Sequence, residues 1–297
     1  MKRSNFLSEW PTLAVLIGAY TAWFLAIFVL APVSLTAAVI VAALAIAQHA
    51  SLTHEAIHGH PFRSKRANAA LVWPALGLLY PYARFRDTHL AHHLDCDLTD
   101  PYDDPESNFL APSEWRACAV PLKWLLEANN TLLGRLVLGP VIGTVFFLRN
   151  EVRLSKTQPN VLRGWLSHVP AVLAVLLVLH IAGMPFGAYL LAAYIGNALI
   201  RIRTFLEHRA HETARGRSVI IEDSGPLALL FLNNNLHAVH HLHPGVPWFR
   251  LPRLYRARQD HFLRSNDGYR YASYGEVFRE HLLTAKDPVA HPLYRHD

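Results

Sequence analysis

Four long runs of apolar residues divide the chain into two pairs. The first pair comprises residues 12–30, nineteen residues without a charge, and residues 33–53, separated by a proline-containing turn. The second pair comprises residues 166–184 and 186–206, separated by a Gly-Met-Pro break. An apolar run of about 20 residues is long enough to cross a bilayer as an α-helix. The pattern therefore predicts two transmembrane hairpins.

Two shorter apolar stretches, residues 69–82 and 132–148, are less suited to crossing a bilayer. Pro74 and Gly77 interrupt the first stretch, and Arg135 lies within the second. An arginine at the centre of a bilayer costs about 2.5–3.5 kcal/mol even on the lenient insertion scale. We expect both stretches to form interfacial or re-entrant helices, with a spanning role for 132–148 left open.

Basic residues lie at the ends of both predicted hairpins. They are Lys2, Arg3, Arg63, Lys65 and Arg66 for the first hairpin, and Arg163, Arg201, Arg203, Arg209, Arg215 and Arg217 for the second. Loops rich in lysine and arginine stay on the cytoplasmic side. We therefore expect a multi-pass integral membrane protein whose hairpin ends and polar tail, residues 251–297, are cytoplasmic. We expect residues 1–297 to form a single domain.

Composition excludes several classes of protein. Hydrophobic residues make up 52% of the chain and charged residues only 17%, so a disordered chain is excluded. The net charge of +6 is modest and no base-reading motif accompanies it, so we expect no nucleic-acid partner. Two cysteines, Cys96 and Cys118, are too few for a zinc ribbon, an iron–sulfur cluster or a fused rubredoxin. The 19 histidines, in contrast, point to metal binding.

Eight histidines fall into three clusters with helical spacing. They are His54 and His58, then His89, His92 and His93, and finally His237, His240 and His241. Side chains three or four residues apart share one face of a helix, so each cluster can present several imidazoles to an ion. Eight imidazoles exceed the four ligands that close a structural zinc site, and two ions fit the number better. Imidazole suits iron, copper, zinc and nickel, so ligand type alone does not select the metal.

Two alternative interpretations deserve comparison. His54-Glu-Ala-Ile-His58 matches the zinc-protease pattern, but its position at a predicted membrane surface among further histidines argues against a protease. A non-catalytic membrane metal-binding or transport protein is the rival from another class. Transporters usually place ionisable residues near the middle of spanning helices, whereas these clusters lie at helix ends.

The order HxxxH, HxxHH, a long gap with a predicted hairpin, and HxxHH resembles the membrane fatty acid desaturase superfamily. This superfamily includes acyl desaturases, hydroxylases and carotenoid ketolases. The resemblance covers about residues 33–252 and extends to Asp100-Pro101, Asp104-Pro105 and the Pro-Trp-Phe-Arg-Leu-Pro segment that ends at Pro252. It implies an all-α integral membrane protein, with four transmembrane helices in two hairpins and a cytoplasmic histidine-rich cap.

The resemblance also implies a reaction. Members of the superfamily use two non-haem iron ions, O2 and electrons from a separate ferredoxin, rubredoxin or cytochrome-type donor. We therefore expect an oxidoreductase that acts on paired donors with reduction of O2, and an acyl-lipid desaturase before other members. A hydroxylase or ketolase of a lipid or carotenoid is the alternative. The substrate is expected to be a lipid or acyl chain that enters from the bilayer.

The resemblance assigns metal binding to the eight clustered histidines and to a ninth, His208, shortly after the fourth predicted helix. His211, one helical turn later, is its competitor. Thr204 replaces an asparagine that holds iron through water in some acyl desaturases. His60 is expected either in a loop or as an outer partner of a metal ligand, and not as a ligand itself. No catalytic residue beyond the metal centre is assigned.

Several carboxylates lie near the histidine clusters, and two interpretations of them stay open. They are Glu55, Asp87, Asp95, Asp97, Asp100, Glu106, Glu207 and Glu212. Such groups either orient metal-binding imidazoles through the second ring nitrogen or face solvent.

Overall fold

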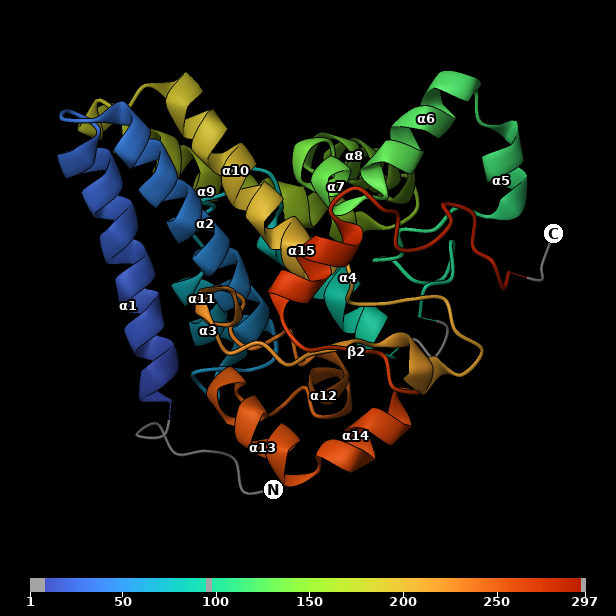
Figure 1. The fold of residues 1–297 in the computed structure, drawn as a ribbon. Coiled ribbons are helices and arrows are strands. Elements are labelled where there is room, and N and C mark those ends of the chain that lie inside the picture. The colour runs from blue at the N-terminus through green and yellow to red at the C-terminus, as the bar shows by residue number, and fades with distance from the viewer. Residues whose placement is uncertain (1–8, 95–97, 295–297) are drawn as a thin grey trace. The chain divides into compact units, whose positions relative to one another are not determined.

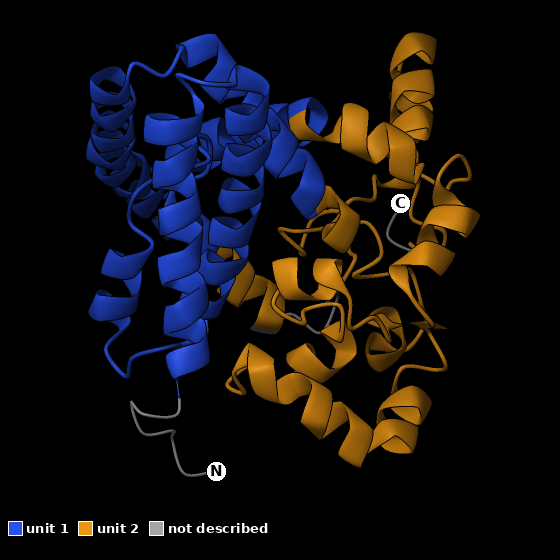
Figure 2. Cartoon of the chain, turned by 60° about the vertical axis from the view of Figure 1, so that its left-hand side comes forward, with its two compact units in different colours: residues 1–87, 141–200 blue, residues 88–140, 201–297 orange. Residues whose placement is uncertain are grey.

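The structure, a computed structural model, describes residues 9–94 and 98–294. Lys2, Arg3, Asp95, Cys96 and Asp97, which the sequence analysis considered, lie outside the described residues. Helices make up most of the described chain (Figure 1). The chain divides into two compact units, residues 1–87 with 141–200 and residues 88–140 with 201–297 (Figure 2).

The first unit contains the long apolar helices. They are α1 (Trp10–Phe24), its π-helical continuation η2 (Leu25–Leu30), α2 (Leu35–Ile57), α9 (Pro159–Ala182) and most of α10 (Phe186–Thr204). The same unit contains α3 (Lys65–Leu71), the first turns of α4 (Tyr82–Leu94) and most of α8 (Gly139–Ser155).

Among the described residues, three helices are long and apolar enough to cross a membrane. They are Trp10–Leu30, Leu35–Ile57 and Pro159–Ala182. The predicted runs 12–30, 33–53 and 166–184 thus correspond to helices, the third of which begins at Pro159, seven residues earlier than expected. The fourth predicted run, 186–206, is helical as α10, but Asn197, Arg201 and Arg203 make it more polar than the other three.

Small residues allow the helices of the first unit to approach closely. Ala38, Ala42 and Ala43 are fully buried on α2. A Cβ atom on Gly196 of α10 would lie 2.9 Å from the carbonyl oxygen of Ala43, so only glycine permits this helix crossing. Small residues at such crossings are typical of membrane helices, because they bring two backbones into van der Waals contact.

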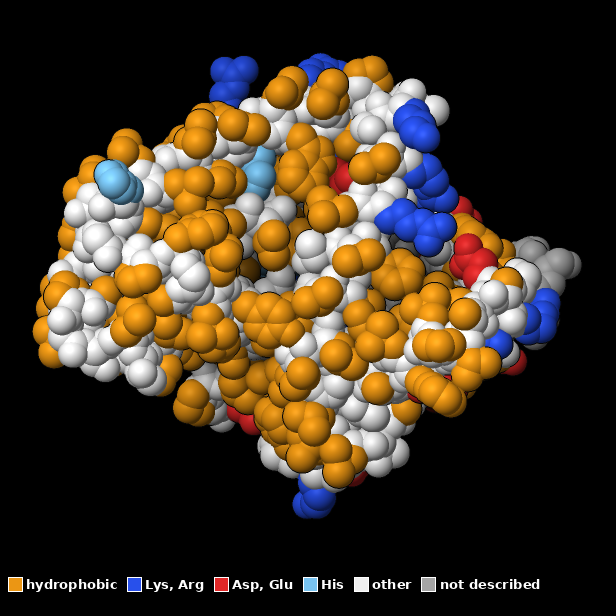
Figure 3. Space-filling view, turned by 90° about the horizontal axis from the view of Figure 1, so that it is seen from above, with side chains coloured by type: hydrophobic (Ala, Val, Ile, Leu, Met, Phe, Trp, Pro, Cys, Tyr) orange, Lys and Arg blue, Asp and Glu red, His pale blue; other side chains and the backbone are white. Residues whose placement is uncertain are grey.

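Hydrogen bonds between buried aromatic residues reinforce the core of the first unit. The indole of Trp23 donates to the Tyr189 hydroxyl at 2.8 Å, and this hydroxyl donates to the Leu76 carbonyl at 2.8 Å. The outward sides of the helices carry exposed apolar residues, such as Ile17 at 66% and Ile181 at 67% exposure. Hydrophobic side chains also predominate on the face drawn in Figure 3. Such surfaces suit lipid rather than water.

The two shorter apolar stretches differ from each other in the structure. The prediction of a helix over 69–82 is wrong, because α3 ends at Leu71 and the next helix, α4, begins only at Tyr82. Pro74 and Pro81 lack the backbone N–H that a helix requires, and they account for the break. The stretch 132–148 is helical as predicted, but it forms two helices, α7 (Leu132–Val137) and α8, which meet at Gly139-Pro140.

The second unit is built from short helices around a small parallel sheet. Its helices are α5 (Pro112–Ala117), α6 (Val120–Asn129), α7, α11 (Pro226–Leu230), α12 (His237–Leu242), α13 (Leu251–Ala257), α14 (Gln259–Ser265) and α15 (Tyr274–His281), with the 3-10 turns η3 (Ala214–Arg217) and η4 (Trp248–Arg250). Strand β1 (Ile220–Ile221) pairs with β2 (Arg270–Tyr271). Ile220, Val239 and Phe262 are fully buried, and their cluster packs α12 against β1, α13 and α14.

Candidate metal centre

The histidine clusters lie at the ends of helices or on short helices, as their spacing predicts. His54 lies in the last turn of α2 and His58 caps this helix. Gly59, with φ of 94°, adopts a left-handed conformation that ends the helix directly after His58. The second cluster lies in the last turns of α4, and the third forms most of α12. His208 follows α10 and pairs its backbone with Ser218.

Four imidazoles converge inside the second unit. His92, His208, His237 and His241 each direct one ring nitrogen to a common point, and these four atoms lie within 4.8 Å of one another. His208 Nε2 is 3.0 Å from His92 Nε2 and 3.0 Å from His237 Nε2. His237 Nε2 is also 3.0 Å from His241 Nε2. One residue of the second cluster, two of the third and His208 therefore meet at one position.

Hydrogen bonding alone does not account for this convergence. In neutral His92, Nδ1 donates to Asp104 Oδ1 at 2.8 Å and Nε2 carries a lone pair. His237 Nδ1 donates to Asn234 Oδ1 at 3.3 Å, so its Nε2 also carries a lone pair. His208 Nε2 can offer a single hydrogen, to one of them only. A cation at the meeting point accepts all four lone pairs, so this donor set fits a metal ion.

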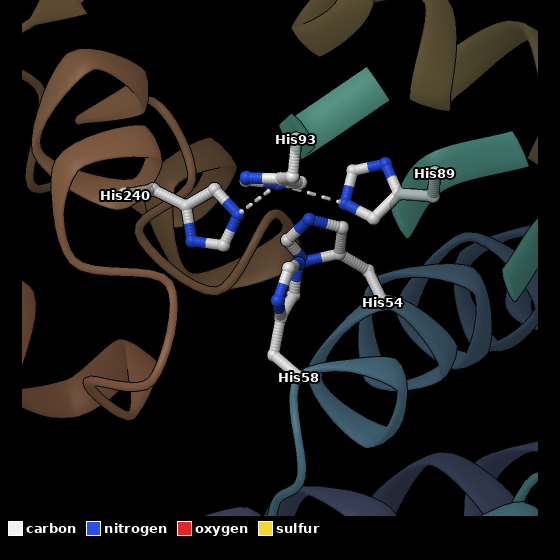
Figure 4. A group of neighbouring side chains, drawn as sticks. All are labelled: His54, His58, His89, His93 and His240. Carbon is white, nitrogen blue, oxygen red and sulfur yellow. Dashed lines mark hydrogen bonds between the residues drawn. The ribbon is translucent and has the colours of Figure 1, made fainter. Parts of the chain in front are cut away.

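A second convergence in the same unit involves His89, His93 and His240. Their ligand atoms also lie within 4.8 Å of one another. His93 Nε2 is 3.1 Å from His89 Nε2 and 3.2 Å from His240 Nε2, the two contacts drawn as dashed lines in Figure 4. In the first unit, the rings of His54 and His58 pack edge to face at 4.7 Å, as their helical spacing predicts. Figure 4 also draws these two side chains.

Burial keeps most of these imidazoles neutral and available as ligands. It lowers the pKa of His208, His237 and His241 well below the ordinary value, and neighbouring histidines lower it further. Burial lowers the pKa of His93 to about 3. For His92 burial also lowers the pKa, but Glu106 and Asp104 outweigh it and raise the pKa to about 9. A divalent cation at His92 Nε2 would take the place of this proton.

Carboxylates hold the second ring nitrogen of several of these histidines. Asp104, only 4% exposed, accepts from His92, and Glu106 Oε1 accepts from His89 Nδ1 at 3.0 Å. Glu207 Oε1 lies 3.6 Å from His237 Nδ1. Such acceptors fix the orientation of an imidazole and increase its basicity towards a metal. For Glu106 the structure thus selects the orienting interpretation, whereas Glu207 accepts from Nδ2 of Asn234 at 3.2 Å, the residue whose Oδ1 accepts from His237.

Other candidates from the sequence lie elsewhere. Asp100 accepts hydrogen bonds from two backbone N–H groups of its own turn. His211 contacts Asp267 at 3.1 Å and belongs to neither group of convergent histidines. His60 pairs with Glu9 at 3.2 Å. The role of Asp104 could be suspected from the Asp104-Pro105 pair after the second cluster, whereas no local signal marked Asn234 or Ser218.

Comparison with known proteins identifies the family of the chain. The sequence profile of the fatty acid desaturase family matches residues 29–273. Over 211 residues the chain is 30% identical to a beta-carotene ketolase from Paracoccus sp. (strain N81106 / MBIC 01143), in an alignment that covers 68% of this chain and 71% of the relative. A beta-carotene ketolase from Paracoccus sp. (strain PC1) is 28% identical over 214 residues, with the same two coverages.

A helical chain with three apolar helices and convergent histidines is typical of a membrane-embedded, histidine-rich oxidoreductase. With most of its length matched by the profile, the chain belongs to the fatty acid desaturase family.

Proposed function

We propose that this protein is an O2-dependent membrane oxidase with two iron ions, which attacks C–H bonds of a long apolar substrate. The observation that carries the proposal is the convergence of His92, His208, His237 and His241, with ring nitrogens too close to be satisfied by hydrogen bonds alone. The family supports iron as the metal, because its members are generally non-haem iron enzymes.

The nine candidate ligands divide between the two ions. We assign one ion to the four-histidine group and the other to His89, His93 and His240. His54 and His58, which lie at the end of α2 in the first unit, complete the set of candidate ligands that the family resemblance implies.

When bound, the two irons would supply the reduction of O2 and the oxidising power for C–H cleavage. The chain's own residues do the rest. Asp104 and Glu106 keep the Nδ1–H tautomers of His92 and His89, so that each Nε2 lone pair is directed to its ion. The buried imidazoles His237 and His240 exclude water from the centre.

We propose that a separate protein supplies the electrons and that it is a ferredoxin, a rubredoxin or a cytochrome. The two cysteines of the chain are fewer than the four thiolates that an iron–sulfur cluster or a rubredoxin centre requires.

The relatives favour a carotenoid as the substrate and ketolation as the reaction. Both are beta-carotene ketolases and align with about two thirds of this chain. The acyl-lipid desaturase expected from the sequence is the second candidate, and the family profile supports it. Both reactions begin with cleavage of a C–H bond, so the same metal centre serves either.

Mass spectrometry of lipids and pigments distinguishes these two reactions. Cells that make β-carotene would be compared with and without the gene, and with a His237→Ala variant as the inactive control. Ketolation yields pigments in which one oxygen replaces two hydrogens, whereas desaturation yields acyl chains that lack two hydrogens. We expect the oxygenated pigments. Unchanged lipids and pigments, with the protein present and its electron donor supplied, would contradict both candidates.

We also propose that four helices span the membrane, α10 being the fourth, and that the histidine clusters are cytoplasmic. The basic residues at the hairpin ends support this topology. Single cysteines at the exposed positions Arg63 and Arg215, in a chain without Cys96 and Cys118, should be labelled from the cytoplasmic side. A cysteine at Val33, which is 83% exposed between α1 and α2, should be labelled from the opposite side. Labelling of Arg63→Cys and Arg215→Cys from different sides is the outcome this topology forbids.

A further inference from the structure

The chain continues beyond the family match, which ends at residue 273. Residues 282–294, here called the strap, follow α15 and lie against the other segments of the second unit. At its start, the Leu282 carbonyl accepts from Leu133 N at 2.9 Å. Further on, Lys286 N donates to the Asn130 carbonyl, and Asn130 Nδ2 donates to the Asp287 carbonyl. These contacts fix the first half of the strap to the first turn of α7 and to Asn130, which lies between α6 and α7.

The second half of the strap pairs with the segment that carries the orienting carboxylates. Leu110 N donates to the Val289 carbonyl at 3.0 Å, and His291 N donates to the Leu110 carbonyl at 2.9 Å, as in a short parallel ladder. His291 is 8% exposed, and its ring packs on Phe109 at 4.8 Å. A buried histidine is thus held directly beside the segment that leads back to Asp104.

A continuous set of hydrogen bonds leads from the strap to His92. His291 Nε2 and Thr99 Oγ1 are 3.1 Å apart. Thr99 N donates to Asp104 Oδ2 at 2.8 Å, and the other oxygen of this carboxylate accepts from His92 Nδ1 at 2.8 Å. Thr99 is only 2% exposed and has φ of 76°, a conformation that a β-branched residue adopts only when its surroundings impose it. His291 is the strap residue that contacts it.

The strap reaches a second ligand of the same group through Lys286. Its ammonium group donates a hydrogen bond to the carbonyl oxygen of His208 and pairs with Asp287 at 3.2 Å. The ring of His208 is held from the other side, where Ser218 Oγ lies 3.2 Å from Nδ1. Lys286 therefore holds the backbone from which the His208 ring extends.

We infer that Lys286 and His291 of the strap are positioning residues for the four-histidine metal site. His291 acts on His92 through Thr99 and Asp104, and Lys286 acts on the backbone of His208. The inference rests on the proposed function, because it requires that His92, His208, His237 and His241 bind an ion. The strap sets the affinity of the four-histidine group for its ion. It leaves the binding of the ion at His89, His93 and His240 unchanged.

Titration of the full-length, metal-free protein in detergent with Co²⁺ tests the inference without any need for turnover. We expect the wild-type protein to bind two Co²⁺ ions. His291→Ala and Lys286→Met should each weaken one of the two by up to about 10-fold, the lower end of the cost of losing an outer partner of a metal ligand, because neither side chain contacts a ligand ring. In the visible absorption spectrum, only the bands of the more weakly bound Co²⁺ ion should change. His291→Gln retains a polar nitrogen near Thr99 and should restore much of the affinity.

Two further variants sharpen the test. Leu293→Ala alters an exposed residue of the same strap and should bind both ions as the wild-type protein does. Thr99→Val removes the hydroxyl that faces His291. The loss of Co²⁺ affinity in the double variant Thr99→Val/His291→Ala should therefore be much smaller than the sum of the losses in the two single variants.

The possible failures are distinguishable. Two ions bound by the wild-type protein, and both bound equally well by His291→Ala and Lys286→Met, would overturn the role of the strap alone. Loss of both ions to the same extent, together with a lower melting temperature, would mean that the strap only stabilises the fold. Fewer than two ions in the wild-type protein would overturn the proposed metal centre itself.

Discussion

His208→Ala should abolish turnover and remove one of the two metal ions. His208 Nε2 lies 3.0 Å from both His92 Nε2 and His237 Nε2, so its loss opens the centre of the four-histidine group. Loss of an outer partner alone typically lowers activity by about 10–100-fold, so loss of a ligand should cost at least about 100-fold. Metal content per purified chain and turnover in membranes would be measured together.

His211→Ala is the matched control, since it removes an imidazole three residues later in the same segment. His211 contacts Asp267 and Thr213 and belongs to neither convergent group. This variant should keep both ions and most of the activity. Full metal content and activity in His208→Ala, with both lost in His211→Ala, would show that the ninth ligand is His211 and not His208.

Glu151→Ala should destabilise the protein more than any substitution of an exposed carboxylate. Glu151 accepts from Arg84 Nε at 2.7 Å and from Arg84 Nη2 at 2.9 Å, and both side chains are 3% exposed. It also accepts from Trp165 Nε1 at 2.9 Å. Removal of one partner of a buried ion pair leaves a buried charge and costs about 3–5 kcal/mol. Thermal unfolding in detergent would show this as a large fall in the melting temperature.

Close packing around Arg84 leaves its side chain little room to move after Glu151 is replaced. A Cβ atom on Gly164 would lie 2.8 Å from Arg84 Cδ, so α9 already contacts the arginine side chain closely. The double variant Arg84→Met/Glu151→Leu replaces the pair by apolar groups and should recover much of the lost stability. Glu114→Ala, at an exposed position of α5, is the neutral control. A Glu151→Ala variant as stable as Glu114→Ala would contradict the importance of this ion pair.

The helices that carry the histidines were predictable, because the spacing of residues within each short segment indicates a helix. The spacing of His237, His240 and His241 predicts a helix, and α12 begins at His237 and ends at Leu242. The apolar runs predicted the long helices for the same reason. The helix predicted over residues 69–82 was wrong, because the apolar composition of this stretch is typical of a helix while Pro74 and Pro81 prevent one.

The partners of the metal site were less predictable, because they depend on contacts between distant segments. Glu106 and Glu207 could be named in advance, but whether they faced imidazoles or solvent depended on the fold. His291 lies 192 residues from Thr99 in the sequence, and no motif relates the two. His208 stood alone in the sequence and was identified only through resemblance to a family.

The metal content of the active protein tests the central claim most directly. Iron and zinc would be quantified per chain in full-length protein that was purified in a form able to turn over with O2 and a reduced electron donor. The account predicts about two irons per chain, because nine imidazoles are more than one ion can use. Active protein that contains stoichiometric zinc and no iron would contradict it.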